Sequence, residues 1–270
     1  MPYRWISFTT DYGLRDGFVA ACHGVIARLA PDVRVIDVSH LVPPQQVRPG
    51  AAVLAQTVPS LPESVHLAVV DPGVGTARRG LIVVAGRGVL VGPDNGLLLP
   101  AAEALGGVKA AYAIEVPEPT YATFHGRDVF APVAAQLALG ADPASFGSAV
   151  TDPVRLPDPL VAAFPGKLVS DVLTVDHFGN VQLAATAADL ELTGLTGGVT
   201  VHSARLAVPA TIGRTFGDVP QGANLLYPDS AGRLAIAVNG GSAAAVLDLG
   251  SGQECTITAS PQRLVSGNDG

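Results

Sequence analysis

The sequence of 270 residues contains only two cysteines, one methionine and one tryptophan, and charged residues make up 14% of it. The two cysteines, Cys22 and Cys255, are far apart and form no CxxC pair, so the sequence predicts neither a cysteine zinc site nor a disulfide framework. We expect each of them to be a small buried hydrophobic side chain.

Basic residues are also scarce. Sixteen Lys and Arg residues oppose 23 Asp and Glu residues, and the resulting net charge of -7 is spread along the chain. Because no block of basic residues is present to neutralise a row of phosphates, the composition argues against nucleic acid as a partner.

Long apolar runs are absent even though 48% of the residues are hydrophobic. Gly, Pro or a charged residue interrupts every run before it reaches the roughly 20 residues that cross a bilayer, so we expect no membrane segment. The first residues, Met1 to Trp5, lead directly into an apolar strand-like run, without the apolar region and cleavage site of a secretory signal. We therefore expect a cytoplasmic protein.

Residues 1–152 are predicted to form an α/β domain. Strand-like and helix-like patterns alternate in the order Trp5–Thr10, Phe18–Leu29, Val33–Val38 and Gly50–Val58. Two further runs, Val65–Val70 and Leu81–Ala85, are continuously apolar, as in strands that are covered on both faces. These patterns favour a central, mostly parallel sheet.

Residues 153–166 contain four prolines, a density that predicts a linker between domains. From residue 167 to residue 270, short apolar runs are separated by Gly, Asn and Asp turns. The runs that we interpret as strands include Lys167–Val175, Gly198–His202, Arg233–Val238 and Ala243–Asp248. The second domain is therefore predicted to be mostly β and barrel-like.

Four polar clusters follow strand ends of the first domain, where α/β sheets collect their ligands. In the first cluster, Asp11 and Asp16 have the chemistry to bind hydroxyls and an ammonium group, although Asp16 is equally suited to cap the next helix. The second cluster is rich in glycine but lacks the GK[ST] ending of a P-loop and the GxGxxG pattern of a dinucleotide site. Taken alone, its Asp71 and Arg78 indicate an ion pair that stabilises the loop.

The third cluster, residues 92–96, is typical of a tight turn. The fourth places His125, Arg127 and Asp128 within four residues, which is dense for a weakly charged chain, although a structural role for His125 stays open. The six histidines are scattered singly along the sequence, which argues against a metal-dependent hydrolase. In the second domain, residues 176–180 and 239–241 follow apolar runs, and turn formation accounts for them nearly as well as binding.

Read together and in order, seven segments resemble one family: TTDYGLRDGFVAACHGVI, PDVRVIDVSHLVPPQQVRPGA, LAVVDPGVGTARR, GPDNGLL, TFHGRDVFAPVAAQLA, DHFGNV and AVNGGSAA. The family is that of the S-adenosyl-L-methionine hydroxide adenosyltransferases, relatives of the fluorinases and chlorinases, and the resemblance runs from Ile6 to Leu249. It implies an N-terminal α/β domain and a C-terminal β-barrel. It also implies a homotrimer, with each site between the first domain of one subunit and the second domain of its neighbour.

The activity implied by the resemblance is hydrolysis of S-adenosyl-L-methionine to adenosine and L-methionine, without metal or cofactor. The residues matched to positioning and activation of water are Asp71, Arg78 and His125. Since the sulfonium departs as a neutral thioether, the reaction needs no acid, and a water held in line with the ribose 5′ carbon accelerates the slow part. Whether Asp71 or His125 takes the proton is open at this stage.

The resemblance also implies contacts with the substrate. Asp11 is matched to the ribose hydroxyls, and both Asp16 and Asp176 are matched to the methionine ammonium group, for which acceptor-only carboxylates are suited. The positions matched to adenine are Phe178, Asn180, Phe216, Val238, Asn239 and Gly240. Phe124 is expected beneath the ribose and the sulfonium. Ser230 is matched to the methionine carboxylate, although an Arg that fluorinases carry next to it is absent.

Two alternative functions compete with hydrolysis: a chlorinase-like halogenase and a non-catalytic sensor. The halide-using relatives carry a Tyr where Asp71 stands, and fluorinases carry a Ser where Gly126 stands. A charged Asp71 would repel a halide but accept a hydrogen bond from water, so we favour hydrolysis over a chlorinase-like reaction. A non-catalytic sensor of S-adenosylmethionine or adenosine would have no use for the three residues matched to water activation.

Overall fold

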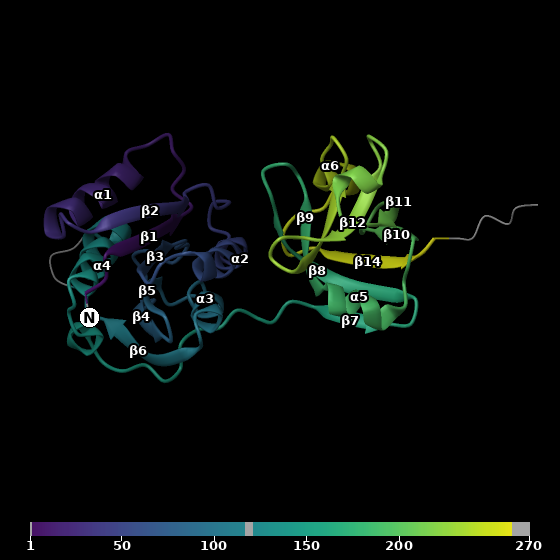
Figure 1. Cartoon of the computed structure of the whole chain (residues 1–270). Helices are drawn as coiled ribbons and strands as arrows, with labels where there is room; N and C mark the ends of the chain where they lie inside the picture. The colour runs from purple at the N-terminus through teal and green to yellow at the C-terminus, as the bar shows by residue number, and fades with distance from the viewer. Residues whose placement is uncertain (1, 117–120, 261–270) are drawn as a thin grey trace, which may run out of the picture. The chain divides into compact units, whose positions relative to one another are not determined.

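The structure, a computed structural model, describes residues 2–116 and 121–260. The chain divides into two compact units, one up to Pro157 and the other from Asp158 (Figure 1). This division falls within the predicted linker 153–166, but Val161–Phe164 in that segment form a strand, β7. The predicted domain limits at residues 152 and 167 stay a prediction.

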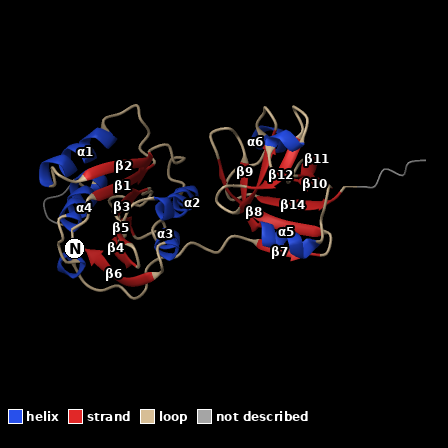
Figure 2. Ribbon diagram, in the orientation of Figure 1, coloured by secondary structure: helices blue, strands red, loops and turns tan. Residues whose placement is uncertain are grey.

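The first unit is built around a six-stranded sheet with the strand order β2-β1-β3-β5-β4-β6 (Figure 2). Its elements are β1 (Trp5–Thr10), α1 (Phe18–Leu29), β2 (Arg34–Ser39), α2 (Val47–Thr57), η1 (Val58–Ser60), β3 (Val65–Val69), β4 (Gly80–Ala85), β5 (Gly88–Pro93), α3 (Leu99–Ala104), β6 (Val108–Ile114), η2 (Gly126–Phe130), α4 (Ala131–Ala138) and η3 (Pro143–Phe146).

This sheet is mixed, which corrects the expectation of a mostly parallel one. Strands β2, β1, β3 and β5 are parallel neighbours, whereas β4 runs antiparallel to both β5 and β6. The reason is the connection between β4 and β5, which consists of Gly86 and Arg87 alone. Two residues can make a hairpin, but a parallel crossover needs about a dozen. The continuous apolar pattern of Leu81–Ala85 showed burial and carried no information about strand direction.

Helices cover both faces of this sheet, with α1 and α4 on one face and α2 and α3 on the other (Figure 1). Alternate residues of β3 therefore enter different cores: Leu67 and Val69 pack with α1 and α4, while Ala68 between them packs with α2 and α3. Because β1, β2 and β3 are parallel, the loops that follow them lie at one edge of the sheet. Three polar loops thereby meet there.

The second unit is a closed barrel, as the sequence predicts. Seven strands form the ring β14-β10-β11-β12-β13-β9-β8, which closes through pairing of β8 with β14, and β7 adds to β8. The elements are β7 (Val161–Phe164), β8 (Lys167–Val175), β9 (Val181–Thr186), α5 (Ala187–Thr193), β10 (Gly198–His202), β11 (Ala207–Ile212), η4 (Phe216–Asp218), β12 (Asn224–Pro228), β13 (Arg233–Val238), α6 (Ala243–Leu247) and β14 (Glu254–Ala259).

One strand prediction in this unit is wrong. Residues Ala243–Leu247, expected to be extended, form the short helix α6. The hydroxyl of Ser242 accepts a hydrogen bond from the Ala245 N–H at 3.2 Å and so caps the helix start. Alanine has the highest helix propensity, and a short apolar run has no periodicity that separates helix from strand.

Both cysteines are buried, as predicted, and they lie in the cores of different units. Burial raises the pKa of each thiol to about 12, so both are protonated thiols at neutral pH. Across the two described stretches of the chain, no helix is both long enough and apolar enough to cross a bilayer.

The buried His66 in β3 predicts a pH-dependent stability. Burial lowers its pKa to about 4, whereas an unfolded chain titrates near 6.5. Unfolding therefore takes up a proton below pH 6.5, and the free energy of unfolding should fall by about 1.4 kcal/mol per pH unit from there towards pH 4. Urea unfolding at several pH values measures this slope. His66→Gln does not titrate and should show a smaller slope; equal slopes would contradict the prediction.

Candidate active site

The loop after β1 carries Asp11 and is held by the loop after β2. The Gln45 N–H donates to Asp11 Oδ2 at 2.8 Å, and the Gly13 N–H donates to the His40 carbonyl oxygen at 2.7 Å. Gln45 has a φ of 64°, a left-handed conformation that is costly for a residue with a side chain. Such strained conformations concentrate at functional sites, and nothing in the sequence indicated this one.

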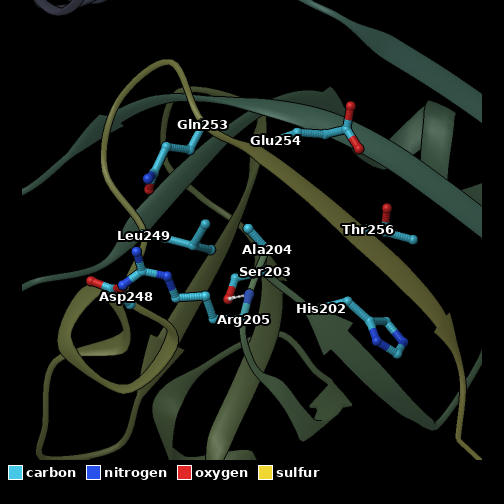
Figure 3. Close-up of a pocket in the computed structure, with 9 residues that line it drawn as sticks. All are labelled: His202, Ser203, Ala204, Arg205, Asp248, Leu249, Gln253, Glu254 and Thr256. Carbon is cyan, nitrogen blue, oxygen red and sulfur yellow. Dashed lines mark hydrogen bonds and ion pairs between the residues drawn. The ribbon is translucent and has the colours of Figure 1, made fainter.

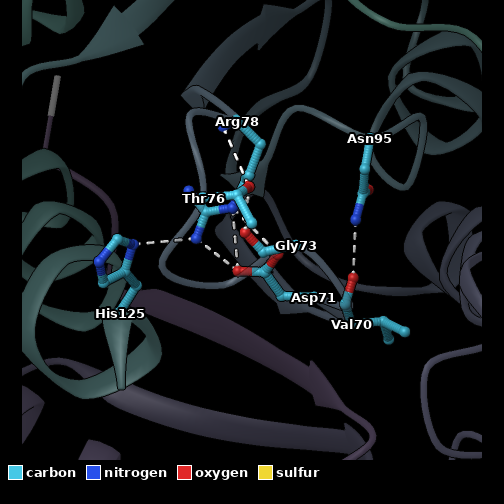
Figure 4. Close-up of polar contacts among 7 residues, drawn as sticks. All are labelled: Val70, Asp71, Gly73, Thr76, Arg78, Asn95 and His125. Atoms are coloured by element: carbon cyan, nitrogen blue, oxygen red, sulfur yellow. Dashed lines mark hydrogen bonds and ion pairs between the residues drawn. The ribbon is translucent and has the colours of Figure 1, made fainter. Parts of the chain in front are cut away.

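The loop after β3 carries Asp71 in an ion pair with Arg78 (Figure 4). The Arg78 Nε–H group donates to both carboxylate oxygens, at 2.9 and 3.1 Å, and Nη2 donates to Oδ2. The side chain of Asp71 is only 6% exposed, and that of Arg78 is 11% exposed. The turn predicted at residues 92–96 starts later, because Gly92 and Pro93 end β5 and the bend begins at Asp94. Within the bend, the Asn95 amide donates to the Val70 carbonyl oxygen at 2.8 Å and so fixes the residue that precedes Asp71.

His125 joins this pair from the other side of Arg78. It precedes η2, a single turn of π-helix that continues into α4, and such turns recur at functional sites. Nη2 of Arg78 lies 3.0 Å from His125 Nδ1. Burial and then the Arg78 cation lower the pKa of His125 below its usual 6.5, so the imidazole is neutral at pH 7. Since a guanidinium only donates, Nδ1 accepts and the single ring proton lies on Nε2.

A glycine in the second cluster allows the Asp71 loop to pack against the segment before His125. Gly75 has a φ of 76°, and a Cβ built there would lie 2.8 Å from the Ala122 carbonyl oxygen. Any other residue would need that backbone to move. This glycine therefore serves close packing, in keeping with the absence of a phosphate-binding motif.

Asp11, Asp71 and His125 line one cavity of about 150 Å³. Its other lining residues are Tyr12, Phe18, Val69, Val74, Thr123, Phe124 and Gly126. The Phe124 ring makes near-perpendicular contacts with the rings of Phe18 and Tyr12, at centroid distances of 5.2 and 5.8 Å. Sites for drug-sized ligands measure about 300–1,000 Å³, so this cavity accommodates only part of such a ligand.

Tyr12 and Phe18 were not among the predicted site residues, although both belong to the first motif of the family resemblance and line the cavity. Asp16 was expected near the methionine ammonium group or at the cap of α1. The helix starts after Gly17 without a side-chain cap, so the capping interpretation is wrong. Asp16 is exposed in the turn before α1, and it does not line the cavity.

In the second unit, the segments matched to adenine meet at one end of the barrel. The Ala244 N–H of α6 donates to the Gly179 carbonyl oxygen at 3.0 Å, which joins the 176–180 turn to α6. The Asn239 amide donates to the Val219 carbonyl oxygen at 2.9 Å and so joins the loop before α6 to the 216–219 turn. Asn180 and Gly240 belong to these segments, and Val238 is the last residue of β13, directly before the loop. The rings of Phe178 and Phe216 are 75% and 40% exposed, leaving apolar faces open for stacking.

Asp176 already accepts hydrogen bonds within its own turn, from the N–H groups of Phe178 and Asn180, both at 2.9 Å. Tyr227, which the sequence analysis missed, packs its ring 5.5 Å from that of Phe216. Burial, followed by the charges of Asp176 and Asp229, raises the pKa of this phenol. Ser230 lies in the turn before β13, at the opposite end of that strand from Val238.

A larger hollow of about 410 Å³ lies elsewhere on the second unit (Figure 3). Its lining includes His202, Gln253 and Glu254, together with an ion pair at 3.3 Å between Arg205 and Asp248. It contains none of the residues that the sequence analysis matched to substrate. Size alone therefore does not identify the candidate site.

Comparison with known proteins identifies the family. Residues 6–147 match the SAM hydroxide adenosyltransferase N-terminal domain, and residues 170–256 match the corresponding C-terminal domain. The chain belongs to the SAM hydroxide adenosyltransferase family.

Individual relatives differ in how similar they are. The (R)-S-adenosyl-L-methionine hydrolase of Salinispora arenicola (strain CNS-205) is 62% identical over 264 residues, covering 94% of this chain and 98% of that protein. The fluorinase of Actinoplanes sp. (strain N902-109) is 30% identical, and the match covers 94% of this chain and 97% of the fluorinase. The crystal structure of an uncharacterized conserved protein from Thermotoga maritima superposes with a TM-score of 0.87 at 36% identity. The superposition covers 94% of this chain and 99% of that protein.

The close approach of Gly126 to Tyr12 predicts that a side chain at residue 126 weakens ligand binding by displacing the Tyr12 phenol. A Cβ at residue 126 would overlap the Tyr12 hydroxyl oxygen. Because this oxygen ends a side chain that can swing, Gly126→Ala should displace the phenol in the cavity without unfolding the protein. We expect the affinity for adenosine, measured by calorimetry, to fall about tenfold, which corresponds to about 1.4 kcal/mol.

Tyr12→Phe provides the matched control for this prediction. Combined with Gly126→Ala, it should restore part of the lost affinity, because the overlapping atom is gone. Unchanged affinity in Gly126→Ala, or no recovery in the double variant, would show that the contact does not shape the cavity.

Proposed function

We propose that this protein hydrolyses S-adenosyl-L-methionine to adenosine and L-methionine in the cytoplasm. The observation that carries the proposal is the continuous chain of contacts from Asp71 through Arg78 to His125, beside the cavity that Asp11 also lines. Family membership and the hydrolase named at 62% identity support the same reaction.

We infer that Asp71 takes the proton from water. Each of its oxygens accepts from Arg78 and has further capacity to accept from water. His125 has Nδ1 occupied by Arg78 and carries its proton on Nε2, so it can donate to the attacking oxygen but not accept from it. In this mechanism the oxygen bonds to the ribose 5′ carbon, the C5′–S electron pair leaves with sulfur as a neutral thioether, and the proton passes through Asp71 to solvent.

The proposed substrate is the R epimer at sulfur. The support is the name of the Salinispora relative, which specifies (R)-S-adenosyl-L-methionine. The two epimers exchange the positions of the methyl and aminocarboxypropyl groups, so carboxylates that hold the ammonium group can distinguish them. Asp16 and Asp176 are the proposed holders of that group, with Ser230 at the methionine carboxylate.

We further propose a homotrimer in which the second unit of a neighbouring subunit completes each site. A cavity of about 150 Å³ in the first unit leaves the adenine and much of the methionine to be bound elsewhere. Large apolar side chains of the first unit are exposed in the single chain, among them Leu14 at 66%, Leu41 at 67% and Tyr121 at 75%. Covering them in an assembly would be favourable.

The hydrolysis is tested by incubating metal-free protein with each epimer in heavy-oxygen water, with and without chloride, and analysing products by mass spectrometry. Labelled adenosine from the R epimer is the expected product. A chlorinated nucleoside would identify a halogenase instead, and a bound but unchanged ligand would identify a sensor.

The division of roles predicts an order of activities among variants. Asp71→Asn should lower kcat by about 10²–10⁴ with little change in substrate affinity, because the proton acceptor is lost. His125→Gln, whose amide still donates, should retain more activity than His125→Ala. The exposed Asp32→Asn is the matched carboxylate control and should match the parent. Equal losses for the two His125 variants, with a mild effect of Asp71→Asn, would assign the proton to His125.

The composite site predicts that two inactive variants complement each other. Asp71→Asn removes the first half of a site and Phe216→Ala removes the second. In mixed trimers formed from equal amounts, about a quarter of the sites combine two intact halves, so about a quarter of the parent activity should return. Light scattering measures the mass of each assembly. Absence of recovery in verified mixed trimers would place both halves within one subunit.

A further inference from the structure

Two of the histidines that are scattered in the sequence meet at one carboxylate in the fold. The Nε2 atom of His23 on α1 donates to Asp37 Oδ1 at 2.8 Å, and the Nε2 atom of His40 lies 3.0 Å from the same oxygen. These three ligand atoms all lie within 4.8 Å of one another. Asp37 is on β2, and His40 directly follows this strand.

The spacing of these atoms is close to that of a metal site. Two imidazole nitrogens and one carboxylate oxygen are typical ligands of zinc and of neighbouring divalent transition metals. Bonds of about 2.0 Å put the ligand atoms of a tetrahedral site about 3.3 Å apart. The two separations from the Asp37 oxygen, 2.8 and 3.0 Å, would need to grow by about 0.3–0.5 Å, and the two imidazole nitrogens, which lie within 4.8 Å of each other, would need to settle at about the same spacing.

The environment of His40 is typical of a histidine that binds a metal. Its side chain is only 4% exposed, and its Nδ1 lies 2.9 Å from the Thr10 hydroxyl oxygen. In the tautomer whose Nδ1–H donates to that oxygen, Nε2 has its lone pair free, and a fixed second nitrogen is characteristic of histidines that bind metals. Despite the short distance to Asp37, the buried Nε2 has no aligned hydrogen-bond partner. A buried nitrogen left without a partner is costly, and a bound cation would satisfy it.

The outer side of the cluster is accessible. The side chains of His23 and Asp37 are 34% and 46% exposed, so a metal can enter from solvent and complete its coordination with water. None of the three residues lines the cavity that contains Asp71. This cluster is therefore separate from the proposed site of hydrolysis.

We propose that His23, Asp37 and His40 bind one divalent transition-metal ion of the zinc class. The ion links α1 to the end of β2, and through His40 it stabilises the loop that carries Asp11. His40 contacts this loop twice, with its ring at Thr10 and with its carbonyl oxygen at the Gly13 N–H. The role of the metal is structural, and the hydrolytic step does not involve it.

Calorimetry of the metal-free full-length protein with zinc chloride tests this proposal. We expect one zinc per chain and a rise in melting temperature on binding. His23→Gln and Asp37→Asn should each weaken zinc binding by more than about tenfold, the loss that follows even from removing a hydrogen-bond partner of a metal ligand. His177→Gln, which removes an exposed histidine of the second unit, should bind zinc as the parent does.

Both ligand variants alter partly exposed side chains, so folding is checked by their melting temperature without zinc. No binding by the parent, or equal binding by the parent and both ligand variants, would overturn the proposal. The cluster would then be a hydrogen-bonded His–Asp–His network. Hydrolysis is measured separately, so failure of the metal site leaves the proposed function intact.

Discussion

The guanidinium group of Arg78 sets the chemistry of its neighbours because it can only donate. It donates to the Asp71 carboxylate and so fixes its orientation, and by donating to Nδ1 of His125 it leaves that ring with a proton on Nε2. Its own position is fixed by the Phe130 ring, 5.1 Å from the guanidinium carbon. Phe130 directly precedes α4 and is fully buried in the core that the sheet forms with α1 and α4, so the position of Arg78 is tied to the packing of that core.

Much of this arrangement could be predicted from sequence, for identifiable reasons. Asp11 follows the strand-like run Trp5–Thr10 and Asp71 follows the apolar run Val65–Val70, so both were expected at strand ends. The direction of β4 was mispredicted because burial on both faces gives the same pattern in parallel and antiparallel strands. The two-residue connection at Gly86 and Arg87 contained the missing information. For α6, a short alanine-rich run was ambiguous, and the capping by Ser242 decided it.

Other features had no signal in the sequence. Gln45 reaches Asp11 across 34 residues through a backbone N–H, a group that every residue except proline possesses. In the sequence, Tyr227 looks like an ordinary strand residue, and only the fold brings it near Phe216 and Asp176. His23, Asp37 and His40 converge because α1 crosses over between parallel strands, and their spacing of 14 and then three residues matches no linear motif.

The contact between Gly126 and Tyr12 limits the routes by which this fold can change its chemistry. A substitution at residue 126 meets the phenol of Tyr12 first, so its effect depends on which residue already occupies position 12. The order of substitutions in this chain therefore matters: once Tyr12 has been replaced by a smaller residue, a side chain at residue 126 no longer meets the phenol, whereas the reverse order passes through a variant whose phenol is displaced.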